Sequence, residues 1–225
     1  PIVIAQAQGS QKIPLTIINN PKLVHRLCAV VMDVTIKPSP KYIQERLETS
    51  GIRSLNSVID VTNYVMRTIG HPTHVFDYDR IANHTIIVQE SKKGEQITTL
   101  DNKTYTLEGG DIIAVDGDKN IIDLLGVMGL KNTVVTNDTK RIIFFIDNND
   151  TAKIRKTSMG LSIRTEAAVL NEKGVDPELA YDALCYGINL LEKIADGKIV
   201  SNITDMYPDK PKPTTVSVLQ ETINK

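Results

Sequence analysis

Hydrophobic residues recur every three or four positions near residue 60, which predicts one amphipathic helix. The apolar positions with this spacing are Val58, Val61, Val65 and Ile69. Asn56 or Ser57 stands where a helix N-cap is expected, and Gly70 stands where a helix ends. Pro72 disfavours helical geometry at His71. We therefore expect a helix that stops at Gly70, followed by a rigid turn.

Beyond residue 84 the pattern changes to short apolar runs rich in β-branched residues, separated by turn residues, which is typical of strands. An earlier stretch, 26–36, has the same character. Asp101-Asn102-Lys103 separates two runs and predicts a hairpin. The run RIIFFI at 141–146 is apolar on both faces, so we expect a central, fully covered strand. The other predicted strands are 84–90, 97–100, 104–107, 111–116, 120–127 and 198–200.

Helical signals flank this β-rich stretch. Ser39 as N-cap and Pro40 at the first helical position predict a helix that ends before Gly51. Its apolar stripe is expected to be Ile43, Leu47 and the aliphatic part of Tyr42. Three further helices are predicted at Thr151–Met159, Glu166–Lys173 and Pro177–Ala195. We expect a linker at 208–213 and another strand and helix at 214–225. The fold class is therefore α+β, a mixed, mainly antiparallel sheet with packed helices.

Composition narrows the function classes only slightly. The 225 residues carry 26 Lys and Arg against 27 Asp and Glu, a net charge of −1, which argues against a general polyanion binder. Cys28 and Cys185 lie far apart and form no metal or redox spacing, so we expect buried free thiols. No His or Cys spacing predicts a metal site, and no apolar run is long enough to span a bilayer.

Three blocks together resemble a known family. NSVIDVTNYVM with GHPTHVFD, GVMG at 126–129, and IRKTSMGLSIRTEAAVLNEKGVDP at 154–177 occur in that order. In this, the chain is similar to the central, tRNA-editing module of the bacterial phenylalanyl-tRNA synthetase beta subunit. The resemblance implies a lead-in from the preceding module at 1–21, an editing-type module of two intertwined lobes at 22–207, and a linker with the start of the next module at 208–225.

The turn after the first helix carries the first candidate site residues. The resemblance places an editing-site histidine at His74, with Pro72 and Asn63 as further pocket residues. A neutral imidazole and an amide can orient a water or hold the terminal ribose of a tRNA. A buried imidazole bonded to backbone is the alternative for His74. His25 and His84 stand at the edges of elements, where we expect surface positions.

Two further blocks complete the expected pocket. Gly126 and Gly129 would let the backbone approach a ligand closely, although a glycine pair beside a strand is more often a turn. Thr165 precedes a helix and predicts an N-cap. The resemblance also places its hydroxyl near the ester carbonyl, with Ala167 in the substrate site. The bulky Leu125 and Leu130 depart from the small residues usual in that family.

Phe145 is the strongest departure. In the resembling proteins a glutamate at this place accepts a hydrogen bond from the phenol of wrongly attached tyrosine. Burying a phenol without an acceptor costs about 1–3 kcal/mol, or about one to two decades of selectivity. We therefore expect Phe145 and Leu125 to fill the former pocket. Asp147, two residues on and on the same strand face, is the alternative acceptor.

Charged residues around the last block have structural and functional interpretations. We expect Glu166, Glu172 and Asp176 to form ion pairs or caps. The basic residues are either a solvated helix face or contacts for phosphates, and the two are left open. They are Lys153, Arg155, Lys156 and Arg164.

The resemblance implies a module of a cytoplasmic ligase that charges tRNA(Phe), with post-transfer hydrolysis of Tyr-tRNA(Phe) in this module. From the departures at Phe145, Leu125, Leu130 and Asp147 we expect that hydrolysis to be impaired here. The implied partners are the tRNA 3′ end, the alpha subunit and the rest of the beta chain, with no membrane. No cofactor is expected in this module, and ATP and Mg²⁺ belong to the parent enzyme. One alternative is an active editing hydrolase with a shifted pocket. Another is a freestanding trans-editing or RNA-binding protein.

Overall fold

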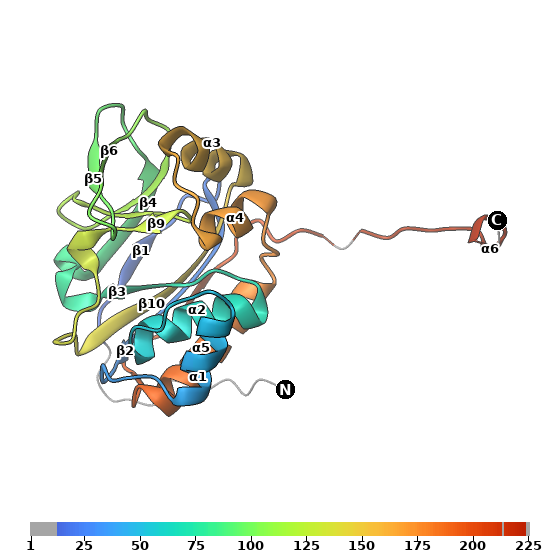
Figure 1. The fold of residues 1–225 in the computed structure, drawn as a ribbon. Coiled ribbons are helices and arrows are strands. Elements are labelled where there is room, and N and C mark those ends of the chain that lie inside the picture. Colours follow the sequence, from blue (N-terminus) through green and yellow to red (C-terminus); the bar gives the residue numbers. More distant parts are fainter. Residues whose placement is uncertain (1–12, 213, 224–225) are drawn as a thin grey trace.

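The computed structural model describes residues 13–212 and 214–223 and contains two main sheets (Figure 1). One has the strand order β1–β4–β7–β8–β9, and the other has the order β11–β2–β10–β3, with β12 also paired to β2. Among the strand pairs of the described residues, only β1–β4 is parallel. The mixed, mainly antiparallel α+β fold predicted above is confirmed.

The strands are β1 (Thr16–Ile18), β2 (Val24–Asp33), β3 (His74–Asp77), β4 (Thr85–Glu90), β5 (Gln96–Thr98), β6 (Thr104–Thr106), β7 (Ile112–Val115), β8 (Ile121–Leu124), β9 (Met128–Gly129), β10 (Arg141–Asn149), β11 (Lys198–Ile199) and β12 (Thr204–Met206). The α-helices are α1 (Lys41–Thr49), α2 (Ser57–Ile69), α3 (Thr151–Leu161), α4 (Glu166–Lys173), α5 (Leu179–Ile194) and α6 (Gln220–Ile223). Among these described residues, no helix combines the length and apolar character needed to cross a bilayer.

β10 is the central strand that its double-sided apolar pattern predicts. It pairs with β2 on one edge and with β3 on the other. Ile143 and Phe145 face a core shared with the β1–β9 sheet. Ile142, Phe144 and Ile146 face a second core, which α1, α2 and α5 complete. One strand therefore forms a wall of both hydrophobic cores.

α2 has the bounds that its sequence pattern predicts. The Asn56 side chain accepts hydrogen bonds from the backbone N–H of Val58 and Ile59, so Asn56 is the N-cap. Gly70 closes the helix with a left-handed φ of 84°. The chain then turns at Pro72 and enters β3 at His74. The N-cap, the terminal glycine and the proline turn together set the position of His74 at the start of β3.

Some local predictions are wrong. Ser39 does not cap α1, because its hydroxyl donates to the buried Asp60 at 2.6 Å and Pro40 takes the cap position. Tyr42 is 49% exposed and adds nothing to the buried stripe. Residues 214–219 form no strand. His84 is only half exposed, because its ring stacks on Tyr78 with centroids 4.1 Å apart.

Candidate functional site

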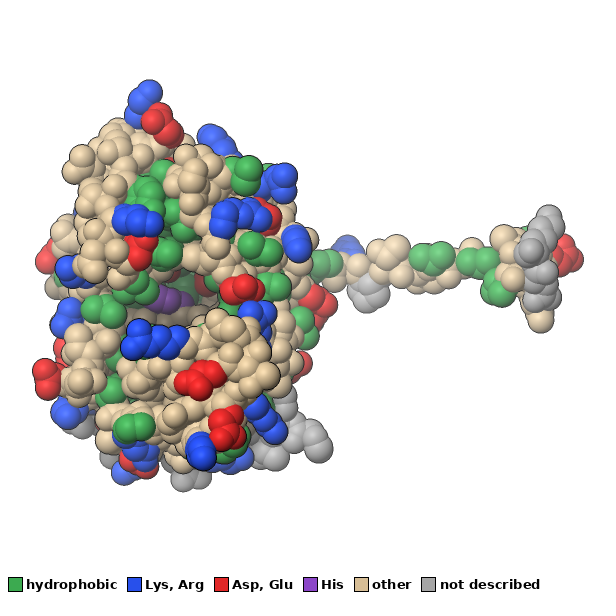
Figure 2. Space-filling view, viewed as in Figure 1, with side chains coloured by type: hydrophobic (Ala, Val, Ile, Leu, Met, Phe, Trp, Pro, Cys, Tyr) green, Lys and Arg blue, Asp and Glu red, His purple; other side chains and the backbone are tan. Residues whose placement is uncertain are grey.

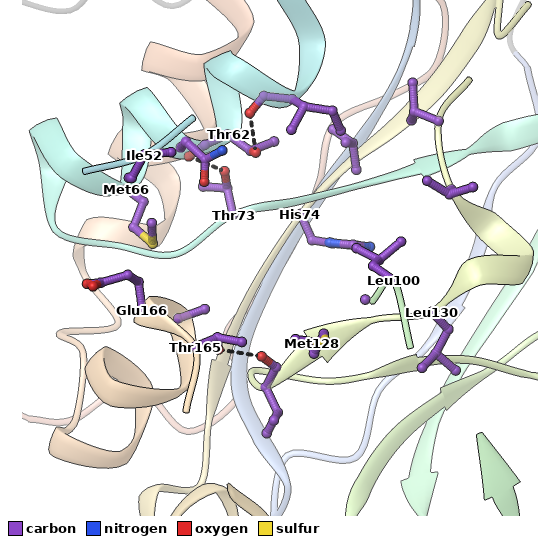
Figure 3. Close-up of a pocket in the computed structure, with 18 of the residues that line it drawn as sticks. Ile52, Thr62, Met66, Thr73, His74, Leu100, Met128, Leu130, Thr165 and Glu166 are labelled. Atoms are coloured by element: carbon purple, nitrogen blue, oxygen red, sulfur yellow. Dashed lines mark hydrogen bonds between the residues drawn. The ribbon is translucent and has the colours of Figure 1, made fainter. Parts of the chain in front are cut away.

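His74 lies at the base of a pocket of about 640 Å³. Figure 2 shows a histidine side chain in a central hollow, with Lys and Arg side chains around it. The pocket is lined by α2 and the loop before it, by β3, by the β5–β6 hairpin tip, by residues between 127 and 135, and by the start of α4 (Figure 3). Most of the lining is apolar, including Ile52, Met66, Leu100 and Met128. A pocket of this size accommodates a small organic ligand.

His74 is held by its position on β3 and by its neighbours. Its ring meets that of Phe76 edge-on, with centroids 4.5 Å apart. Burial lowers the pKa of His74 to about 4. The imidazole is therefore neutral at pH 7 and offers one donor and one acceptor nitrogen. Among the described residues, no hydrogen bond to either nitrogen is present, so the alternative of an imidazole bonded to backbone is not what the structure has.

Thr165 is the N-cap of α4, as its sequence position predicts. Its Oγ1 accepts a hydrogen bond from the backbone N–H of Ala168 at 3.0 Å. The same oxygen donates to the carbonyl of Val127 at 2.6 Å, so α4 is tied to the β8–β9 turn (Figure 3). The hydroxyl proton is thereby used. At the pocket wall Thr165 retains at most one acceptor position.

Gly126 and Gly129 bring the backbone close to other side chains. Gly126 has φ 69°, and a Cβ there would lie 2.6 Å from Nδ2 of Asn149. A Cβ at Gly129 would lie 2.7 Å from Cε1 of His74. A side chain at either position would therefore force a neighbouring side chain to shift, and the positive φ of Gly126 favours glycine there as well. The turn consequently packs directly against the base of the pocket.

A second, smaller cavity of about 60 Å³ adjoins the pocket. His74, Gly129 and Ala167 line both spaces. Asp147 lines the small cavity and accepts a hydrogen bond from Asn149 Nδ2 at 2.6 Å. Burial raises the pKa of Asp147 to about 6.

Asp123 also lines the small cavity, and the sequence interpretation missed it. It is 4% exposed, and its Oδ1 has no hydrogen-bond partner. Burial, followed by the nearby Asp147 carboxyl, raises its pKa well above the ordinary value. The available signal was a carboxylate inside the apolar run Ile121–Leu124, three residues before Gly126.

The structure brings together most of the predicted site residues. The large pocket is lined by Asn63, His74, Gly129, Thr165 and Ala167, together with Leu130. The small cavity is lined by Pro72, His74, Gly126, Gly129, Asp147 and Ala167. Leu125 and Phe145 line neither space, because both are completely buried in the core between the sheets. Phe145 packs edge-on against Phe76 with ring centroids 5.4 Å apart.

Charged residues near the site form the predicted ion pairs and caps. Glu172 accepts a 2.7 Å bond from Arg164. Asp176 caps the backbone N–H of Glu178. Glu166, at the pocket wall, pairs with Arg67 of α2 at 3.4 Å, a contact between two walls that sequence spacing could not show. Across the described residues, no group of three His, Cys, Asp or Glu side chains could hold a metal ion.

Comparison with known proteins agrees with the sequence blocks. A B3/4 domain matches residues 24–196. The phenylalanine–tRNA ligase beta subunit of Clostridium acetobutylicum is 39% identical over 204 residues, covering 90% of this chain and 26% of the relative. That of Thermotoga maritima is 37% identical over 196 residues, covering 87% of this chain and 25% of the relative. The chain thus spans about a quarter of the length of these relatives.

A solved structure has a similar fold. It is an N-terminal fragment of the phenylalanyl-tRNA synthetase beta subunit from Pyrococcus horikoshii, with a TM-score of 0.56 and 15% identity. The match covers 87% of this chain and 53% of that fragment. At this identity the likeness concerns the fold alone.

Proposed function

The chain belongs to the B3/4 domain family, and from that membership we propose that it is one module of a phenylalanine–tRNA ligase beta subunit. In this role it supports the charging of tRNA(Phe) with phenylalanine. The alpha subunit and the remainder of the beta chain are then its partners. ATP and Mg²⁺ would bind at the synthetic site of the alpha subunit, and we assign no residue of this chain to them.

Within that module, the 640 Å³ pocket is the proposed site for the aminoacylated 3′ end of tRNA(Phe). Apolar walls suit an aromatic side chain, and the neutral His74 can hold a ribose hydroxyl or a water. Asn63, on α2, lines the same space and adds an amide. Thr165 contributes mainly by tying α4 to the β8–β9 turn, since its proton is already donated to Val127.

Hydrolysis of the tyrosyl ester is proposed to be impaired, and the burial of Phe145 is the observation that carries this. Phe145 is 0% exposed and fills the space beside His74. The adjoining cavity of about 60 Å³ is well below the roughly 150 Å³ that holds a benzene ring in a protein core. A phenol therefore finds no carboxylate at position 145, and the small cavity lacks the volume for its ring.

An active hydrolase with a shifted acceptor is the second candidate, because Asp147 lines the small cavity together with Gly126, Gly129 and Ala167. For this candidate, the cavity would have to open around a tyrosyl ring. The carboxyl of Asp147 would then accept the phenol hydrogen bond.

Deacylation of Tyr-tRNA(Phe) by the complete ligase separates the two candidates. The native enzyme and a Phe145→Glu, Leu125→Ala variant are compared, and His74→Ala is added to the variant as the control. We expect an inert native enzyme and a variant that hydrolyses only while His74 is present. Hydrolysis by the native enzyme that disappears in Asp147→Asn would instead establish the shifted acceptor.

A further inference from the structure

The small cavity beside the pocket contains two carboxyl groups and no cation. Asp123 comes from β8 and Asp147 from β10, so two different sheets each contribute one acid. Among the described residues, no Lys, Arg or His lies within ion-pair distance of either carboxyl. Burying two such groups without a counter-ion is costly, so this arrangement is not explained by folding stability.

Acceptor atoms are left over at this place. Oδ1 of Asp123 and Oδ1 of Asn149 are buried without a hydrogen-bond partner, and each residue is 4% exposed. The Asn149 amide nitrogen already donates to Asp147. The Asn171 amide nitrogen already donates to the carbonyl of Gly126. Oδ1 of Asp123 and Oδ1 of Asn149 thus remain free acceptors, with the N–H of the neutral His74 as a donor at the same cavity. A ligand group that donates hydrogen bonds, and preferably a cation, satisfies these acceptors.

The volume limits what that group can be. Liquid water occupies about 30 Å³ per molecule, so a cavity of about 60 Å³ holds one or two small polar groups and excludes an aromatic ring. A primary ammonium has three donors, the positive charge and the required size. A guanidinium, by contrast, is larger and planar.

The cavity adjoins the pocket, and the two spaces share part of their lining. Six residues line both spaces: Thr73, His74, Val127, Met128, Gly129 and Ala167. Gly129 packs closely against the His74 ring, since a Cβ there would lie 2.7 Å from Cε1 of His74. For a ligand in the pocket to reach the two carboxyls, one short group must extend past His74.

We propose that Asp123 and Asp147 form a recognition subsite for the α-ammonium group of an aminoacyl ester. This inference rests on the proposed function, because it takes the pocket as the site of an aminoacylated tRNA end. The amino acid side chain then lies among the apolar walls of the large pocket. Recognition is directed to the amino group that all aminoacyl esters share, and the phenol of tyrosine is not what the carboxyls bind.

Calorimetric titration of the 225-residue chain tests this directly. The chain lacks the synthetic site of the alpha subunit, so binding reports this pocket. The probes are 3′-(L-phenylalanylamino)-3′-deoxyadenosine, a non-hydrolysable amide, and its N-acetyl derivative, which lacks the ammonium. We expect the first to bind at least about tenfold more tightly. Asp123→Asn, Asp147→Asn should abolish that difference.

Asp116→Asn is the matched control, because Asp116 is a buried carboxyl beside the same sheet that does not line the cavity. It should keep the native preference. Equal binding of both probes to the native chain would overturn the ammonium subsite and leave the pocket assignment intact. Binding of neither probe would overturn both.

A double variant that loses both probes equally, or that melts well below the native chain, would show that the carboxyls are structural. The subsite predicts the opposite. Because burial without a cation raises the pKa of both carboxyls, replacing them with amides should leave the melting temperature at neutral pH unchanged or raise it.

Discussion

His74 and Phe145 are directly opposed on neighbouring antiparallel strands, β3 and β10. Their side chains face the same core, where Phe76 contacts both rings, at 4.5 Å from His74 and 5.4 Å from Phe145. The residue that departs most from the family pattern is therefore a structural support of the histidine at the base of the pocket. A substitution at either residue should therefore alter the environment of the other side chain.

Phe145→Ala tests that coupling. The truncation leaves a cavity in a tightly packed core and should lower the free energy of unfolding by about 3–5 kcal/mol. It should also shift the His74 ring resonances in an NMR spectrum. Phe144→Ala is the matched control, because Phe144 is equally buried but faces the other core. A similar stability loss with unmoved His74 resonances is expected there, and equal His74 shifts in both variants would contradict the coupling.

Thr165→Ala removes the acceptor for Ala168 N–H and the donor to the Val127 carbonyl. Loss of an N-cap together with a tertiary hydrogen bond should cost about 1–3 kcal/mol in urea unfolding. Thr165→Ser retains the oxygen and should recover most of that stability. If the serine variant is as unstable as the alanine variant, the methyl group and not the cap carries the effect.

Gly126→Ala should be far more harmful than Gly70→Ala. Both glycines have positive φ, 69° and 84°, so both substitutions carry backbone strain of about 1 kcal/mol. At Gly70 a Cβ meets nothing within 4 Å, whereas at Gly126 it would lie 2.6 Å from Asn149 and 2.8 Å from Ile154. Thermal unfolding of the two variants measures the difference. Equal melting temperatures would show that the turn can move away from β10.

Asp147→Asn should stabilise the protein at neutral pH and not at acid pH. The pKa of Asp147 is raised in the folded chain, from 3.8 to about 6, so the native state holds its proton more tightly. That contribution is complete below pH 4 and is lost as pH rises through 6. At pH 7.5 the variant should therefore gain on the order of 2–3 kcal/mol over the native chain. A less stable variant at pH 7.5 would show that the hydrogen bond from Asn149 to the carboxylate outweighs the cost of burying its charge.

Local periodicity was sufficient to predict most elements, because each has a strong signal of its own. α2 has a cap, an apolar stripe and a terminal glycine, and β10 has apolar residues on both faces. The prediction of Ser39 as an N-cap was wrong because its hydroxyl donates a hydrogen bond to Asp60, 21 residues later, and the sequence does not reveal this. Competition from a distant side chain has no local pattern.

The candidate site was predicted in the same uneven way. Motif residues such as His74, Gly129 and Thr165 meet at one pocket, although they come from segments far apart in the chain. Asp123 was missed, since a single acid in a strand does not reveal which side chain faces it. How deeply each side chain is buried could not be predicted from the sequence either. Spacing placed Phe145 on the face of Asp147, but only the packing shows that one residue ends in the core and the other at a cavity.

The pairing of β2 with β10 has a consequence for synthesis on the ribosome. Asp33 and Arg141 are partners in this ladder, 108 positions apart, and α5 and β12 follow later still. A chain that emerges at roughly 5–20 residues per second must wait several seconds before β2 meets its neighbour. During that interval the apolar strand β2 is exposed, which is when chaperones would be expected to engage it. The pocket at His74 can therefore form only after nearly the whole module has been translated.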